Sequence, residues 1–204
     1  MINGNKFLEY FQGKSIFITG CTGSVGMALL EKFLRSFPQI QKIILLVRSK
    51  KSSNATSRIL HYFENPIFSV MKEVNKDYLK KILWVEGDVI KPNLGLGEED
   101  LSYIQNNVNI FYHCAAAVKL ADTLKNSIQN NLHGTEMVYN VAKGCRNIQC
   151  FMYVSTIFSN HRVTPTELKE EIYKNPINPN LLLEMVNSLN NDELQERCKE
   201  SKDW

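Results

Sequence analysis

The stretch "SIFITGCTGSVGMALLEKF", residues 15–33, decides the fold of this chain. It begins with a short apolar run rich in β-branched residues, passes through three glycines, and then changes to helical periodicity. A helix that starts directly after such a turn presents N–H groups and the positive end of its dipole, which suits a phosphate. A tight turn without a ligand is the alternative that the glycines alone leave open.

The glycines follow the spacing G-x-x-G-x-x-G, and each has its own expected task. Gly20 permits the turn, Gly23 lets the backbone approach a pyrophosphate, and Gly26 lets the helix pack close to the sheet. Ser24 is expected to cap the helix. The residues predicted to bind the cofactor in this stretch are Thr19, Gly20, Thr22, Gly23, Ser24, Val25 and Gly26.

Strands and helices alternate along the first part of the chain. Apolar runs predict strands over 15–19, 42–48, 82–87, 109–115 and 150–156. Helical spacing predicts helices over 25–37, over 59–81 with a break at Pro66, and over 124–143. This order predicts an α/β fold, a doubly wound Rossmann-type parallel sheet flanked by helices, with ligands at the carboxyl ends of the strands.

The composition changes after about residue 160. The remaining segment is more polar, contains three prolines, and predicts two short helices over 179–190 and 192–200 but no further strand. We therefore expect a nucleotide-binding domain over 1–160 and a helical extension over 161–204 that leads towards a catalytic or substrate-binding region. The sheet is expected to be truncated before its later strands.

The end of the second predicted strand indicates which dinucleotide is bound. Enzymes of this plan that choose NAD place an acidic residue there, which binds the ribose 2′-hydroxyl. This chain has "VRSKK" instead, with no acidic residue over 39–53. Arg48 can stack on adenine and bind a 2′-phosphate, and Lys51 adds positive charge. The sequence predicts NADP(H), with a solvated basic loop as the alternative.

Two further strand ends carry candidate cofactor contacts. In "EGDV", Asp88 can accept from the adenine amino group while Val89 packs on the ring. In "HCAAAVK", the alanines Ala115, Ala116 and Ala117 allow the backbone to pass close to a ribose. A turn aspartate and ordinary small core residues are the alternatives.

Composition excludes several classes of protein. Hydrophobic residues make up 44% and charged residues 22%, and the net charge of +3 is too small for a nucleic-acid binder. The five cysteines contain no C-x-x-C pair and no signal peptide is recognised, which indicates reduced thiols in a cytosol-facing protein. The four histidines form no metal-ligand pattern, and no apolar run reaches membrane-spanning length.

Taken together, these motifs resemble the fatty acyl-CoA reductases, within the extended short-chain dehydrogenases. The similarity is carried by the glycine stretch, by "VEGDVIKPNLGLGEEDL", by "FYHCAAAVKLADTLKNSIQNNLHGT" and by "FMYVSTIFSN". It implies reduction of a long-chain acyl-CoA to a fatty alcohol with NADPH. It also implies association of the full-length protein with peroxisomal or endoplasmic-reticulum membranes. Nothing in the sequence indicates the oligomeric state.

The resemblance also implies catalytic residues. Thr156 matches the hydroxyl that polarises the substrate carbonyl, Ser155 is the weaker choice, and Asn131 matches a helix asparagine that organises the active-site hydrogen bonds. The family's Tyr-x-x-x-Lys pair follows that hydroxyl, whereas the literal match here, Tyr139 and Lys143, precedes it and is rejected. The chain is therefore expected to be a fragment or a catalytically deficient product. A non-catalytic NADP(H)-binding module, or a dehydrogenase of sugar nucleotides or steroids, remains the alternative.

Overall fold

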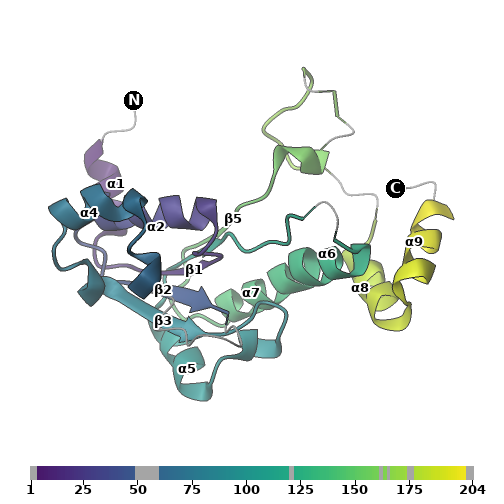
Figure 1. Ribbon diagram of the computed structural model, residues 1–204, viewed down its shortest axis with the longest axis horizontal. Coiled ribbons are helices and arrows are strands. Elements are labelled where there is room, and N and C mark those ends of the chain that lie inside the picture. Colours follow the sequence, from purple (N-terminus) through teal and green to yellow (C-terminus); the bar gives the residue numbers. More distant parts are fainter. Residues whose placement is uncertain are drawn as a thin grey trace.

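Five parallel strands form one sheet in the order β3-β2-β1-β4-β5. The computed structural model describes residues 4–48, 60–119, 122–160, 163–164, 166–173 and 177–200. The strands are β1 (Ser15–Thr19), β2 (Lys42–Val47), β3 (Ile82–Glu86), β4 (Ile110–His113) and β5 (Cys150–Tyr153). The chain reverses its direction across the sheet after β3, so a switch point lies between β1 and β4. This topology confirms the predicted doubly wound α/β fold (Figure 1).

Helices cover both faces of the sheet, and the strands are apolar on both faces for that reason. In β1, Ile16 and Ile18 pack in the cluster beneath helix α2 (Ser24–Ser36), with α4 (Ser69–Val74) beside it. Phe17 points to the opposite face, in the cluster that includes residues of α5 (Glu98–Asn107) and α7 (Gly134–Lys143). Each such fully buried side chain contributes about 1.5–3 kcal/mol to the stability.

The long helix predicted over 124–143 is present but contains a defect. It consists of α6 (Leu124–Ile128), one turn of π-helix, η4 (Gln129–His133), and α7. A π-turn inside an α-helix is rare and is frequently found at a functional site. Among the helices described, none is both long and apolar enough to span a bilayer.

The two short helices of the extension are also confirmed, as α8 (Pro179–Ser188) and α9 (Asn191–Glu200). They pack against α6 through a small cluster that contains Ile128, Val186 and Leu194. Helices α1 (Gly4–Phe11) and α5 were not predicted from the sequence. The remaining short 3-10 turns are η1 (Pro66–Phe68), η2 (Tyr78–Lys81), η3 (Pro92–Gly95) and η5 (Ile157–Asn160).

Strand β5 forms an edge of the described sheet, and its side chains are partly exposed. Met152 and Tyr153 are 44% and 42% exposed, and an apolar groove of about 400 Å³ lies between Met152 and α1. An exposed apolar edge promotes association between chains.

We expect Met152→Lys to reduce light scattering of the purified chain on heating. Val74→Lys, at an apolar residue of α4 that is 65% exposed, serves as the control, and equal effects of both substitutions would contradict this prediction.

Candidate functional site

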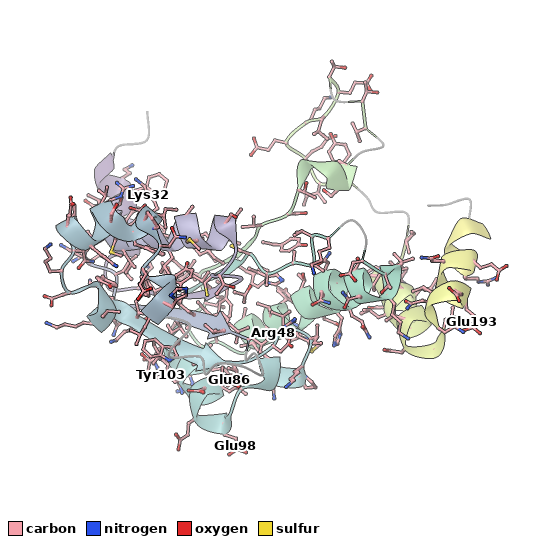
Figure 2. All side chains as sticks on the ribbon, viewed as in Figure 1. Lys32, Arg48, Glu86, Glu98, Tyr103 and Glu193 are labelled. Carbon is pink, nitrogen blue, oxygen red and sulfur yellow. The ribbon has the colours of Figure 1, made fainter. Side chains whose placement is uncertain are left out.

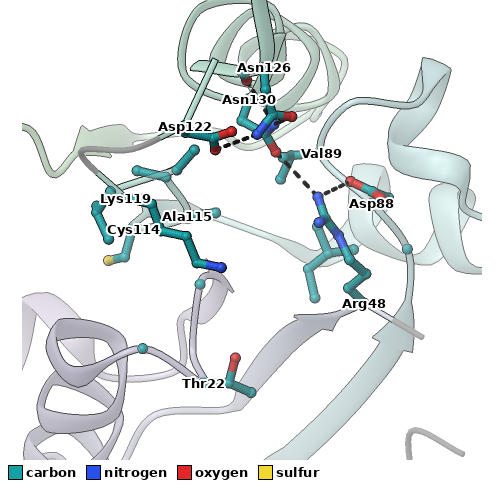
Figure 3. Close-up of a pocket in the computed structure, with 17 residues that line it drawn as sticks. Thr22, Arg48, Asp88, Val89, Cys114, Ala115, Lys119, Asp122, Asn126 and Asn130 are labelled. Carbon is teal, nitrogen blue, oxygen red and sulfur yellow. Dashed lines mark hydrogen bonds and ion pairs between the residues drawn. The ribbon is translucent and has the colours of Figure 1, made fainter. Parts of the chain in front are cut away.

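A cavity of about 540 Å³ lies at the carboxyl ends of four strands, next to the start of α6 (Figure 3). Its walls come from the turn after β1, from the ends of β2 and β3, and from the loop after β4 that leads into α6. It is lined by Gly20, Thr22, Gly23, Leu46, Arg48, Gly87, Asp88, Val89, Cys114, Ala115, Ala116, Ala117, Val118, Lys119, Asp122, Asn126 and Asn130. The chain therefore brings nine of the predicted contact residues, which belong to four separate segments, to one cavity.

The glycine turn can exist only without side chains at two of its positions. Gly20 has a φ of 69°, and an added Cβ would lie 2.5 Å from the Ala115 nitrogen and 2.6 Å from the Cys114 carbonyl carbon. At Gly26, an added Cβ would collide with the Gly20 carbonyl oxygen and would lie 2.8 Å from the Cys21 Cα. The start of α2 is therefore pressed against the turn, and the turn against the loop after β4.

The cap of α2 differs from the prediction. The helix begins at Ser24, so Ser24 is its first residue, and the N-cap is Gly23, which has no side chain to accept a hydrogen bond. The expectation that Ser24 caps the helix is wrong. The N–H groups of a first helical turn have no partner inside the helix, and here no side chain takes the cap position.

Arg48 extends from the end of β2 across the cavity. Its guanidinium donates to Asp88 Oδ1 at 2.7 Å and to Asn130 Oδ1 at 3.4 Å (Figure 3). Its side chain is 55% exposed, whereas that of Asp88 is 16% exposed. Figure 2 shows Arg48 at the centre of the molecule, between the sheet and α6. Lys51, also predicted to contribute charge, lies outside the described residues.

The motif "GDVIKPNLGL" holds Asp88 in place. Asn93, Leu94 and Gly95 all have positive φ angles, of 50°, 61° and 67°, so the backbone folds back towards β3. Leu94 is fully buried, and its carbonyl accepts from the Asp88 N–H at 2.7 Å. An added Cβ at Gly87 would lie 2.5 Å from that same carbonyl oxygen. The left-handed backbone conformation of Leu94 is unusual for a residue with a large side chain. It indicates that the loop after β3 is strained at this position.

Asn131 lies in the π-turn and binds both backbone polar groups of one residue, Ala117, in the loop after β4. The Ala117 N–H donates to Asn131 Oδ1 at 2.7 Å, and Asn131 Nδ2 donates to the Ala117 carbonyl at 3.1 Å. This pair of bonds fixes the loop of alanines that forms one wall of the cavity. Asn131 does not line the cavity itself. Its side chain positions the loop that does.

His113 connects the sheet to the same π-turn and was not singled out from the sequence. It is fully buried, and its Nδ1 lies 2.6 Å from Thr19 Oγ1 while its Nε2 lies 3.0 Å from Thr135 Oγ1. Thr135 donates to the Asn131 carbonyl at 2.6 Å, and the Ala115 N–H donates to Thr19 Oγ1 at 3.3 Å. These bonds assign the ring proton to Nε2. Burial lowers the pKa of His113 from 6.5 to about 4, so the ring is neutral at pH 7.

Several predicted site residues do not line the cavity. Thr19 turns its hydroxyl to His113 inside the sheet, and Val25, on the first turn of α2, is 56% exposed. Ser155 and Thr156 are exposed beyond the end of β5. The residues that the structure does not bring to the cavity are Thr19, Ser24, Val25, Gly26, Asn131, Ser155 and Thr156.

The rejected pair lies away from the cavity. Lys143 Nζ lies 5.8 Å from the centre of the Tyr139 ring, one turn apart on α7, and Tyr139 packs edge-on against Phe151 of β5. Neither residue lines the cavity. The polar residues that do line it and that sequence reasoning missed are Lys119, Asp122, Asn126 and Asn130.

The NAD-binding family described as Male sterility protein matches residues 18–202. Fatty acyl-CoA reductase 1 of Mus musculus is 32% identical over 178 residues, which cover 87% of this chain and 34% of that protein. The putative fatty acyl-CoA reductase CG8306 of Drosophila melanogaster is 33% identical over 189 residues, 92% of this chain and 36% of that protein. The chain thus spans about a third of the length of these curated relatives.

Solved reductase domains share the fold. The reductase domain of a nonribosomal peptide synthetase from Mycobacterium tuberculosis aligns with a TM-score of 0.60 at 23% identity, over 81% of this chain and 39% of that one. The terminal R domain of the myxalamid PKS-NRPS pathway aligns with a TM-score of 0.57 at 29% identity, over 72% and 35%. The chain therefore belongs to the Male sterility protein family of NAD-binding domains, and it is similar to fatty acyl-CoA reductases over about a third of their length.

Proposed function

We propose that this chain binds NADPH and forms the cofactor-binding portion of an enzyme that reduces long-chain fatty acyl-CoA to fatty alcohol. The observation that carries the choice of cofactor is Arg48, which reaches from the end of β2 into a cavity bounded by a glycine turn. The similarity to fatty acyl-CoA reductases supports the choice of substrate. The same proposal includes association of the whole protein with peroxisomal or endoplasmic-reticulum membranes.

The residues of the cavity fit a dinucleotide. Gly20 and Gly23 line the cavity without side chains, and the adjoining helix start suits a pyrophosphate. Arg48 would hold the 2′-phosphate, Asp88 the adenine amino group, and the loop Ala115–Ala117 the ribose. NADPH, when bound, supplies the hydride for the acyl carbonyl.

Two roles are proposed for the chain's own residues in the reaction. The Thr156 hydroxyl, or that of Ser155, would donate a hydrogen bond to the substrate carbonyl oxygen as negative charge develops there. Asn131 would keep the loop of alanines in place through its bonds to the Ala117 N–H and carbonyl. Purified protein that binds NADPH but turns over no acyl-CoA would favour the alternative of a non-catalytic NADP(H)-binding module.

Arg48→Ala is expected to raise the Kd for NADPH about tenfold and to change the Kd for NADH less than about twofold, since a charge-assisted contact to the 2′-phosphate is lost. Fluorescence titration of both cofactors measures this. Lys32→Ala, which removes an exposed cation of α2 remote from Arg48 in Figure 2, is the control and should change neither value. A wild-type chain that binds no NADPH at hundreds of micromolar would exclude the proposed cofactor.

A further inference from the structure

Five polar side chains form a continuous hydrogen-bonded row across the cavity, from α6 to the ends of two strands (Figure 3). Asn126 Nδ2 donates to Asp122 Oδ2, and Asn130 Nδ2 donates to Asn126 Oδ1 at 3.0 Å. Asn130 Oδ1 then accepts from Arg48 at 3.4 Å, and Arg48 donates to Asp88 at 2.7 Å. All five side chains line the cavity.

The two ends of this hydrogen-bonded row decide which way the side-chain amides of Asn126 and Asn130 are oriented. A carboxylate only accepts hydrogen bonds and a guanidinium only donates them. Between Asp122 and Arg48, both asparagines must therefore point their NH₂ groups towards Asp122 and their oxygens towards Arg48. The orientation of Asn130 is fixed a second time, because its Nδ2 also donates to the Asn126 backbone carbonyl at 2.9 Å.

The helix supplies the spacing. Asp122, Asn126 and Asn130 are four residues apart, so they lie on one side of α6 and the π-turn that continues it. Thr123 caps α6 by accepting from the Asn126 N–H at 3.1 Å, and Asp122 Oδ1 accepts from the Thr123 N–H at 2.9 Å. These bonds fix the start of the helix, and with it Asp122, the first residue of the hydrogen-bonded row.

Asn130 and Asp88 hold the same guanidinium in different ways. Asp88 is charged, and its Oδ1 also accepts from the Ile90 N–H at 3.2 Å, which keeps it in place beside β3. Asn130 offers an oxygen dipole without a net charge. It can therefore direct the guanidinium across the cavity while competing little with a phosphate for the positive charge of Arg48. A carboxylate at that position would compete strongly.

We propose that Asn130 is a specificity-determining residue, which orients Arg48 towards the 2′-phosphate of NADPH. Asp122, acting through Asn126, and the Asn126 backbone carbonyl together set the orientation of Asn130. This inference rests on the proposed function, in which Arg48 binds that phosphate. It adds three residues of α6 and its surroundings to the determinants of cofactor choice, and none of them was predicted from the sequence.

Asn130→Asp is expected to raise the Kd for NADPH about tenfold while the Kd for NADH changes less than about twofold, because the new carboxylate competes with the phosphate for Arg48. Asn130→Leu, which removes the acceptor, should lower the NADPH preference about threefold, and Asp122→Asn should lower it less, because the Asn126 backbone carbonyl still holds Asn130. The measurement is fluorescence titration of wild type and variants with NADPH and NADH. Their thermal midpoints verify folding.

Gln129→Glu is the matched control, since it adds the same charge one residue earlier, facing the small cavity beside α8 that Leu183 and Val186 also line. It should leave the ratio of the two Kd values unchanged. The inference is overturned if Asn130→Asp keeps the NADPH preference that Arg48→Ala abolishes, or if it weakens both cofactors equally. A wild-type chain that binds neither cofactor would instead defeat the proposed function itself, and the inference with it.

Discussion

Gly26→Ser is expected to lower the free energy of unfolding by about 3 kcal/mol or more, or to prevent folding altogether. The added Cβ meets the Gly20 carbonyl oxygen and the Cys21 backbone, which are not flexible side-chain ends that could move aside. To relieve this clash, α2 would have to move away from the glycine turn. That movement would disturb the packing of Leu30 and Phe33 against the sheet and would open the cavity at the glycine turn.

Gly97→Ser makes the same chemical change at a permissive site. An added Cβ at Gly97 meets nothing within 4 Å, and Gly97 is the N-cap of α5, where serine is a favoured residue. Its free energy of unfolding should stay within about 0.5 kcal/mol of the wild-type value. Urea unfolding of the three proteins, followed by circular dichroism, measures the difference. Equal stabilities of the two variants would show that α2 is not pressed against the turn.

The fold could be predicted because its signal is local. Strand β1 occupies Ser15–Thr19, the same residues that the apolar run predicts, since a strand covered on both faces must be apolar throughout. Helix α5 was missed because it is mostly polar, with Ile104 its one fully buried residue, so it shows little periodicity. The π-turn has no sequence signal of its own, since its residues also fit a regular helix.

The candidate site was predicted where it follows strand ends and missed where it depends on packing. Arg48 and Asp88 could be found because each ends an apolar run. Asn126 and Asn130 could not, because their spacing is equally typical of a solvated helix face, and only the tertiary structure turns that face to the cavity. Thr19 was expected to contact the cofactor, and in the structure its hydroxyl is hydrogen-bonded to the buried ring of His113, a bond that the sequence did not indicate.

The pH dependence of stability should report on His113. Its pKa is about 4 in the folded chain, lowered by burial, and about 6.5 when unfolded. The neutral ring therefore contributes stability that is fully present above pH 6.5 and is lost as the pH falls towards 4. Between pH 7 and pH 5 this residue alone should cost about 2 kcal/mol of the free energy of unfolding.

His113→Gln removes this titration and should reduce the loss of stability between pH 7 and pH 5 by about 2 kcal/mol, as measured by urea unfolding at both values. At pH 7 the variant itself should be about 1–3 kcal/mol less stable, because the buried hydroxyl of Thr19 or of Thr135 loses its partner. His61→Gln is the control, since the His61 side chain is 85% exposed and faces Glu64 in solvent. If both variants kept the wild-type pH dependence, the bridge between the sheet and the π-turn would not need a neutral histidine, and the Thr19 hydroxyl would have to find another acceptor.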